Sequence, residues 1–152
     1  MESKKEITKN LLANSFKKLI LDIPFKNITI KMITDKSKVI RPTFYHHFKD
    51  KYEVLEYIVD EDIMKNIYEM VDSDMEYESL KIIFIRLEKN REFIKKAFKV
   101  EGQNSFKEIL GYKIYNIFIR IIDKHELNEL YYSNVLTKEN MARYYTNGLI
   151  SF

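Results

Sequence analysis

The sequence predicts an all-α protein. Three glycines and two prolines in 152 residues provide few of the turn formers that a β-protein needs, and lysine, glutamate, leucine and isoleucine dominate the composition. Apolar residues also recur at intervals of three and four along much of the chain, which is the spacing of one helix face. The chain is 45% hydrophobic and 32% charged, as expected for one or two small globular domains.

The first predicted helix begins near residue 3 and ends before Pro24. Ser3 and Glu6 have the spacing of a capping box, in which each side chain bonds to the backbone N–H of the other residue. Apolar side chains follow at helical intervals until the proline, which lacks a backbone N–H and interrupts the helix. These apolar residues are Leu12, Phe16, Leu19 and Ile20.

Residues 25–51, FKNITIKMITDKSKVIRPTFYHHFKDK, predict two short helices joined by a tight turn. Thr29 is placed to cap the first helix, and a turn over residues 37–40 leads into the second, which begins near Arg41. Pro42 suits the first turn of a helix, where its missing N–H would have had no partner. The arrangement is a helix-turn-helix, a motif whose second helix enters the major groove of DNA.

The second helix of this motif divides into a buried and an exposed face. Phe44 and Phe48 are four residues apart on one face, and we expect both to be core residues. The remaining polar and aromatic side chains are distributed over the other faces, where they are free to read a groove.

Five further helices are predicted after the motif. Asp50 and Glu53 repeat the capping-box spacing at the start of a long helix that connects the two halves of the molecule, as Ser105 and Glu108 do for a later helix. The acidic segment 72–78 is expected to be the connection that follows the long helix. Ser105 and Thr137 are placed to cap later helices. The apolar stripes of the five helices span residues 55–71, 80–87, 93–98, 110–121 and 141–152.

Several classes of function are disfavoured by what the sequence lacks. The absence of cysteine excludes a disulfide framework, a thiolate nucleophile and a Cys-ligated metal site. His46 and His47 point in different directions on a helix and His125 stands alone, so we expect no metal site and no cofactor. No nucleophile and base form a recognisable catalytic pattern, which argues against an enzyme. No apolar run reaches the length of a membrane span and no apolar segment follows the charged residues 1–6, so we expect a cytoplasmic protein.

The charge is divided unequally along the chain. Residues 1–51 hold 12 Lys or Arg against 5 Asp or Glu, a net charge of +7, whereas residues 52–152 hold 14 against 18, a net charge of −4. A lysine-rich surface is by itself usually no more than a solvated surface. Beside a helix-turn-helix, however, a basic amino-terminal part favours contact with DNA phosphates.

The helix-turn-helix region resembles the DNA-binding signature of the tetracycline-repressor-like (TetR/AcrR) transcriptional regulators. The likeness covers about the first third of the chain and includes an aromatic run followed by a lysine at a helix start, which is a restrictive pattern. It implies a TetR-like fold, with a three-helix DNA-binding domain over residues 1–50 and a helical dimerisation and ligand domain over residues 51–152. The matching residues are Phe25, Ile28, Thr29, Ile33, Val39 and the run from Thr43 to Lys51.

The sequence departs from the family pattern in the turn between the two helices. Ser37 stands where the family generally has Ala or a similarly small residue, and Lys38 stands where the family has Gly. Lys38 therefore leaves the turn without a residue that adopts a left-handed backbone freely.

Other segments are similar to the dihydroxyacetone-kinase regulator-like subgroup of the same family. They are FKVEGQNSF at residues 98–106 and HHFKDKYEVLEYI at residues 46–58, and YYTNGLISF at residues 144–152 matches in placement. This likeness implies that some members act as activators through a partner protein, so a partner protein and a small-molecule effector are both candidates for the controlling signal.

Seven residues are predicted to contact DNA. Arg41 and Thr43 open the second helix, where a guanidinium meets the O6 and N7 atoms of guanine and a threonine methyl meets a thymine methyl. The resemblance carries over Tyr45 as a phosphate contact and His46 as a contact to a base edge or phosphate. The seven are Thr29, Arg41, Thr43, Tyr45, His46, His47 and Lys51.

Two of these residues, Thr29 and His47, have a structural alternative, whereas Lys51 does not. Thr29 is first of all a helix cap, and a phosphate contact would be an addition to that role. His47 has the alternative of facing the first helix. Lys51 lies in the first turn of the next helix, beside N–H groups that together with its charge attract phosphate, and its placement would be odd without an anion.

A second set of residues is a candidate lining for an effector cavity among the later helices. As the resemblance would allow, aromatic side chains would line it and Glu101 would supply a polar contact. Plain core packing is the favoured alternative, because aromatic stripes at helical spacing are more often core than pocket. The candidates are Phe84, Phe98, Glu101, Tyr112, Tyr115 and Phe118.

The sequence thus predicts a homodimeric regulator that binds double-stranded DNA at a near-palindromic operator. The alternative is a co-regulator that acts by docking a partner protein through its carboxy-terminal helices. The last apolar stripe reaches Phe152 without a stop signal, so the carboxy-terminal end is expected to be cut off.

Overall fold

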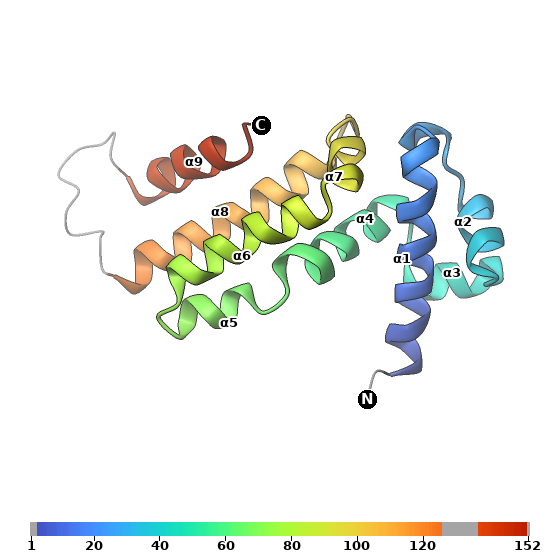
Figure 1. Cartoon of the computed structure of the whole chain (residues 1–152), viewed down its shortest axis with the longest axis horizontal. Helices are drawn as coiled ribbons and strands as arrows, with labels where there is room; N and C mark the ends of the chain where they lie inside the picture. The colour runs from blue at the N-terminus through green and yellow to red at the C-terminus, as the bar shows by residue number, and fades with distance from the viewer. Residues whose placement is uncertain (1–2, 126–136, 152) are drawn as a thin grey trace.

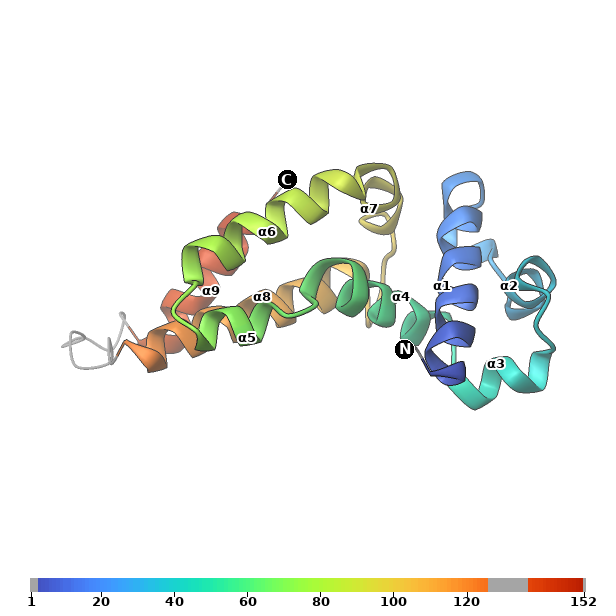
Figure 2. The same cartoon turned by 60° about the horizontal axis from the view of Figure 1, so that its bottom comes forward.

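The computed structural model describes residues 3–125 and 137–151, and within these ranges it contains helices and connections but no strand. The predicted all-α class is confirmed. Helices α1 (Lys4–Asp22), α2 (Ile30–Ser37) and α3 (Arg41–His47) gather at one end of the molecule, and the later helices extend away from them (Figure 1). In the turned view of Figure 2, α2 and α3 still lie on the side of α1 that faces away from the rest.

Two capping boxes predicted from the sequence are formed. The Ser3 hydroxyl accepts the N–H of Glu6 at 3.2 Å, and the Glu6 carboxylate accepts the N–H of Ser3 at 2.7 Å. Ser105 and Glu108 make the same reciprocal pair, at 3.3 Å each, at the start of α8 (Phe106–Lys124). Each pair satisfies two N–H groups that a helix start would otherwise leave without partners.

The long helix predicted over residues 55–71 is interrupted. Helix α4 (Lys51–Val59) passes into a π-helical segment, η2 (Asp60–Met64), and α5 (Ile67–Asp72) begins only after Asn66, whose φ of 61° is left-handed. The prediction of one continuous helix is therefore wrong.

A side chain from a distant helix holds this break. Arg86 Nη1 donates to the carbonyl oxygens of Ile63, at 2.8 Å, and Lys65, at 2.7 Å. A charged donor of this kind replaces the helical partners that the two carbonyls lack. Hydrophobic periodicity could not reveal the break, because Ile63 and Ile67 on either side of it are fully buried.

The acidic segment 72–78 is only partly a connection. Helix α6 (Glu76–Lys89) already contains Glu76 and Glu78 in its first turn, where negative side chains interact favourably with the positive end of the helix dipole. Helix α7 (Arg91–Ala97) follows α6 after a single residue. The later part of the acidic segment is therefore the start of α6, and the connection before it is shorter than predicted.

Helix α9 (Lys138–Leu149) buries a different face from the one predicted. It packs against α8 through small side chains, and Ala142 and Thr146 are almost completely buried there. Tyr144 and Tyr145, which the predicted aromatic stripe placed on the buried face, are 75% and 48% exposed. The end of that stripe at Phe152 lies outside the described residues.

The close approach of α8 and α9 depends on a glycine. A Cβ atom at Gly111 would lie 3.2 Å from Cδ1 of Ile150, which is tighter than ordinary van der Waals contact. Gly111 therefore leaves room for the Ile150 side chain, and the fully or nearly buried residues of α9 at this contact, Ala142 and Thr146, are small.

One cluster of buried apolar side chains extends from α1 to Ile150, just beyond α9. Phe44 and Phe48 belong to it, with 0% and 2% exposed, so their prediction as core residues is confirmed. Over residues 3–125 and 137–151, every helix is too short or too polar to cross a bilayer.

Candidate nucleic-acid interface

The start of α2 is held by the predicted cap. The Thr29 hydroxyl accepts a hydrogen bond from the N–H of Met32 at 3.2 Å, and the backbone of Thr29 has the extended conformation of an N-cap. A hydroxyl has a donor as well as acceptors, so the cap leaves Thr29 able to donate to a phosphate as well. Its exposed position at the start of α2 agrees with both roles.

The turn after α2 requires a left-handed residue, and Lys38 supplies it. Its φ and ψ are 57° and 32°, a conformation in which a side chain costs about 1 to 2 kcal/mol relative to glycine. The next residue, Val39, returns its N–H to the carbonyl of Thr34 at 3.1 Å and closes the turn. The departure from the family pattern noted in the sequence therefore leaves the turn geometry in place.

Helix α3 is anchored by one side and exposed on another. Phe44 is fully buried, and its ring lies 5.9 Å from that of Phe48, centroid to centroid. On the outer surface, Arg41 Nη2 donates to the Tyr45 hydroxyl at 3.2 Å, and the guanidinium carbon lies 5.6 Å from the Tyr45 ring centroid. Both residues are exposed, whereas Thr43 is half-buried.

The two adjacent histidines lie in different surroundings. His46 is exposed on α3, as a DNA contact requires. His47 is half-buried, and its Nδ1 is buried without a hydrogen-bond partner among the described residues. Burial, together with the positive charges of His46, Lys9 and Lys5, lowers the pKa of His47. Two of these neighbours lie on α1, so the environment of His47 favours the alternative that it faces the first helix.

Comparison with known proteins agrees with this geometry. Residues 17–58 match the family model described as bacterial regulatory proteins, tetR family. The HTH-type dhaKLM operon transcriptional activator DhaS of Lactococcus lactis subsp. lactis (strain IL1403) is 26% identical over 138 residues, which span 91% of this chain and 73% of that protein. The solved structure of the dihydroxyacetone kinase operon activator DhaS superposes with a TM-score of 0.65 at 22% identity, covering 96% of this chain and 81% of that one.

The chain is a TetR-like DNA-binding transcriptional regulator. The family match extends from within α1 to within α4 and so includes all of α2 and α3. The family likeness predicted from the sequence is confirmed, and the similarity to the DhaS structure confirms the predicted fold. The assignment of individual DNA-contacting residues stays a prediction.

Lys51 of this TetR-like regulator has a structural role that the sequence did not reveal. Its Nζ donates to three carbonyl oxygens around the short 3-10 turn η1 (Phe25–Asn27), those of Phe25 at 2.7 Å, Ile28 at 3.0 Å and Lys26 at 3.3 Å. Nζ also lies 4.4 Å from the centroid of the Phe25 ring. Carbonyl dipoles therefore account for the placement of this lysine without an anion, and its contact with a phosphate stays a prediction.

Lys9 is a residue of the regulator that sequence reasoning missed. Its Nζ lies 5.3 Å from the Phe48 ring centroid and 5.0 Å from that of Tyr57, so the cation on α1 sits over rings at the ends of α3 and in α4. Such cation–π contacts contribute about 0.5 to 1 kcal/mol at exposed sites. Only the summed charge of the amino-terminal part hinted at lysines like this one, because the rings come from distant segments.

Four exposed lysines lie near α3 in the sequence, on both sides of the helix. Among the residues that the structure describes, Lys31 alone of the four has a carboxylate partner, Asp35, in an exposed pair that contributes little energy. Their positive charge is therefore available for phosphates. The lysines are Lys31, Lys36, Lys38 and Lys49.

The helix-turn-helix region is joined to the rest of the regulator through α1. Lys17 on α1 forms an ion pair with Asp62 in η2 and donates to the Asn90 side chain at 3.1 Å, at the corner between α6 and α7. One lysine thus ties the DNA-binding end to two later segments.

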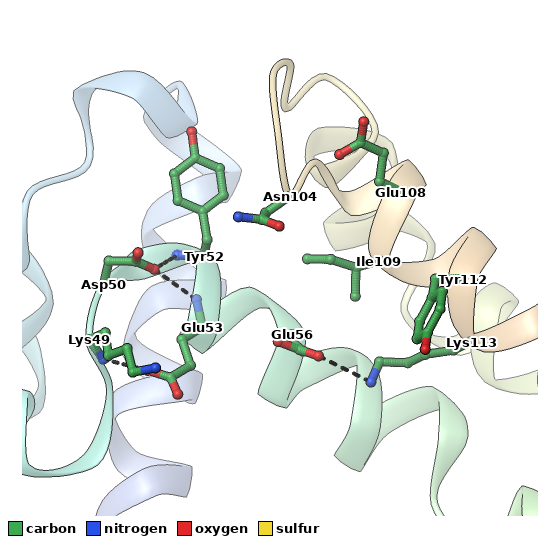
Figure 3. Close-up of a pocket in the computed structure, with 10 residues that line it drawn as sticks. All are labelled: Lys49, Asp50, Tyr52, Glu53, Glu56, Asn104, Glu108, Ile109, Tyr112 and Lys113. Carbon is green, nitrogen blue, oxygen red and sulfur yellow. Dashed lines mark hydrogen bonds and ion pairs between the residues drawn. The ribbon is translucent and has the colours of Figure 1, made fainter.

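A hollow of about 430 Å³ lies between the start of α4 and the start of α8 (Figure 3). Its carboxylates already have partners within the protein. Asp50 accepts the N–H groups of Tyr52, at 2.8 Å, and Glu53, at 3.0 Å, and Glu56 pairs with Lys113 at 3.4 Å. Glu53 accepts from the N–H of Lys49 and not of Asp50, so the predicted capping box at α4 is only half formed.

The six residues predicted to line an effector cavity are dispersed in the structure. Tyr112 and Tyr115 line a cavity of about 360 Å³ against α9, whereas Phe118 and Glu101 each line a different one. Phe84 is 43% exposed on α6. The six residues do not line one common cavity in the structure. Whether any of them contacts an effector stays a prediction. The six are Phe84, Phe98, Glu101, Tyr112, Tyr115 and Phe118.

Proposed function

We propose that this TetR-like regulator binds a near-palindromic operator as a homodimer, with one α3 helix of each subunit in a major groove. The observation that carries the proposal is α3 itself, which is anchored by buried Phe44 and displays Arg41, Tyr45 and His46 to solvent. This helix lies within the segment of net charge +7. In a twofold dimer the two helices would enter grooves about 34 to 36 Å apart.

Arg41 and Tyr45 are proposed to act together. The hydrogen bond and the ring contact between them hold the guanidinium before DNA arrives, which reduces the entropy lost on binding. Arg41 would then pair with guanine and Tyr45 would donate its hydroxyl to a phosphate. Binding should weaken steeply with added salt, because phosphate contacts release counterions.

The dimer is proposed to form through the exposed faces of α8 and α9. Tyr112 on α8 and Tyr144 and Tyr145 on α9 are 68%, 75% and 48% exposed, although each offers a large apolar ring. Aromatic side chains of this kind are enriched where protein surfaces meet. Sedimentation of the wild type and of a Tyr144→Ser, Tyr145→Ser variant tests this face, with a shift toward monomer expected for the variant.

Selection from random DNA duplexes, followed by anisotropy titration of the enriched site, tests the DNA binding. We expect a near-palindrome, and we expect Arg41→Ala to lose about 1 to 3 kcal/mol and to relax specificity at one base position. Tyr45→Ala should weaken binding to every duplex, and Lys81→Gln, an exposed change on α6, should leave the affinity unchanged. Failure to enrich any duplex, or full affinity in both α3 variants, would contradict the proposal.

A second candidate is a co-regulator that docks a partner protein through its carboxy-terminal helices. The observation that favours it is an exposed apolar surface on α6, where Tyr77 is 74% exposed and Ile85 is 56% exposed. In either case the regulator would act by binding, without catalysis. The relative DhaS is a transcriptional activator, so activation of a reporter gene is the direction of control to test first.

A further inference from the structure

A cavity of about 650 Å³ is lined by the end of α1, the turn η1, the start of α4 and the end of α7 with the residues that follow it. Its apolar part includes Ile20, Phe25 and Val100. Small-molecule sites in proteins have this size and usually combine an apolar lining with a few charged or polar groups. The space is therefore large enough for a small organic molecule.

The charged residues that line this cavity are mostly lysines. Four lysines face two carboxylates, Asp22 and Glu101, which leaves the lining with a net charge of +2. The lysines come from different segments of the chain, so only the fold brings them together. They are Lys26 in η1, Lys51 at the start of α4, Lys96 in α7 and Lys99 just after α7.

Within the described residues, the lysines of the cavity form no ion pair that would neutralise their charge. Among residues 3–125 and 137–151, no carboxylate forms an ion pair with Lys26, Lys96 or Lys99. The fourth, Lys51, is held only by carbonyl dipoles, and burial lowers its pKa. A half-buried cation without a counter-charge produces a positive potential that an anion would relieve.

We propose that this cavity binds a small organic anion, with an apolar body against Ile20, Phe25 and Val100 and one phosphate or carboxylate group among the lysines. Lys96 and Lys99 would supply charge-assisted hydrogen bonds. Tyr52, whose ring packs against Phe25 at 4.8 Å, borders the same space.

The position of the cavity gives such an anion a route to the DNA-binding end. Its lining combines residues of α1, η1 and α4 with residues of α7, and Lys51 clamps the turn that precedes α2. A bound anion would also cancel part of the +7 charge of residues 1–51, so we expect it to lower DNA affinity. This regulatory role rests on the DNA binding proposed above, whereas the binding site itself does not.

Calorimetric titration of the full chain without DNA tests the site directly. The probes are phenyl phosphate, benzoate, inorganic phosphate and phenol. We expect phenyl phosphate or benzoate to bind more tightly than inorganic phosphate, because the apolar lining contributes, and we expect phenol to bind weakly for want of charge. The stronger of the two organic anions identifies the acidic group. Lack of binding by both organic anions at millimolar concentration would overturn the proposal.

Matched variants locate the bound anion. Lys96→Gln and Lys99→Gln should each weaken binding about twofold to fivefold, the range of an exposed charge pair. Asp22→Asn removes an opposing carboxylate at the end of α1, so it should tighten binding without harming the helix. Lys81→Gln on α6 is the matched control. Equal affinity in all four variants would show non-specific binding and overturn the site.

DNA titration with and without saturating phenyl phosphate tests the regulatory role separately. At low salt we expect about twofold to fivefold weaker DNA binding with the anion present, and no effect in the Lys96→Gln, Lys99→Gln double variant. Unchanged DNA affinity at saturation would overturn the regulatory role and leave the site established. Absence of DNA binding at any condition would instead contradict the proposed function, since the calorimetric titration does not depend on it.

Discussion

Helices α3 and α9 are both short amphipathic helices that expose tyrosines, yet they are held in opposite ways. Helix α3 is anchored by Phe44, a large side chain with no exposed surface, and it displays Arg41 and His46 to solvent. Helix α9 is anchored by the small residues Ala142 and Thr146, and its tyrosines are exposed.

The difference shows how the anchor of a helix determines what its outer face can do. A large buried ring fixes α3 against the core and leaves a polar surface suited to DNA. Small buried residues bring α9 close to α8, and its large side chains are left outside, where they suit contact with another protein. We therefore expect substitutions at the two anchors to destabilise the protein in different ways, by loss of volume in α3 and by added volume in α9.

The largest effect should come from removing the aromatic anchor of α3. Phe44→Ala should lower the free energy of unfolding by about 3 to 5 kcal/mol, because it leaves a cavity in the core as well as losing apolar burial. Urea denaturation followed by circular dichroism measures this change. The control is Tyr144→Ala on α9, 75% exposed, which should change the free energy by less than about 0.5 kcal/mol at concentrations that keep the chain monomeric.

The anchor of α9 should be sensitive in the opposite sense, to added volume. Ala142→Leu should destabilise the fold by about 1 to 3 kcal/mol, because Ala142 is completely buried where α9 packs against α8 and a larger side chain would overpack that contact. Arg143→Leu, one residue further at an exposed position, is the control. A neutral Ala142→Leu in the same denaturation assay would mean that α9 is held less closely than the structure shows.

Loss of the lysine clamp should have a comparable effect on the amino-terminal end. Lys51→Met keeps the aliphatic stem but removes the donor to three carbonyls, and we expect a loss of about 1 to 3 kcal/mol in the free energy of unfolding. Lys81→Met on α6 is the control. In DNA titration the folded Lys51→Met protein should lose less affinity than Tyr45→Ala. The reverse order would restore Lys51 as a direct phosphate contact.

The turn between α2 and α3 offers a stabilising substitution. Lys38→Gly should raise the free energy of unfolding by about 1 kcal/mol, because glycine adopts the left-handed conformation of this residue without strain. Lys36→Gly, two residues earlier within α2, should lower it by a similar amount. Thermal denaturation of the two variants gives shifts of opposite sign if the turn is as described, and shifts of the same sign if it is not.

The smallest effect concerns the pH dependence of stability that arises from His47, the last residue of α3. The pKa of His47 is lowered below 6.5 in the fold, chiefly by burial, so the unfolded chain binds a proton before the folded one does. Stability should therefore decline as the pH falls through 6.5 toward the folded pKa. His47→Gln should flatten that decline between pH 7.5 and 5.5 in denaturation midpoints, whereas Lys81→Gln, an exposed change on α6, should follow the wild type.

Much of the candidate interface could be predicted from local sequence. The caps at Ser3, Thr29 and Ser105 and the burial of Phe44 are all found where their spacing placed them. Each cap joins residues no more than about one helical turn apart, so it can be predicted from their spacing in the sequence. The charge division could be counted directly.

The failures of prediction share a cause, which is dependence on distant segments. The structural role of Lys51 could not be predicted, because its carbonyl partners lie 23 to 26 residues away in the sequence. The helix break beyond α4 depends on Arg86, more than 20 residues further along the chain. The hydrophobic periodicity of the sequence continues unchanged through this break.

The sequence by itself determined that this chain is helical, that its amino-terminal third carries a helix-turn-helix with an anchored second helix, and that this end is cationic, because helix propensity, capping and charge are properties of neighbouring residues. Only the tertiary structure decided which face of α9 is buried, what surrounds Lys51, and that Lys96 and Lys99 meet Lys26 around one cavity. These features arise from packing between segments far apart in the chain, where the identity of a side chain does not specify its partner.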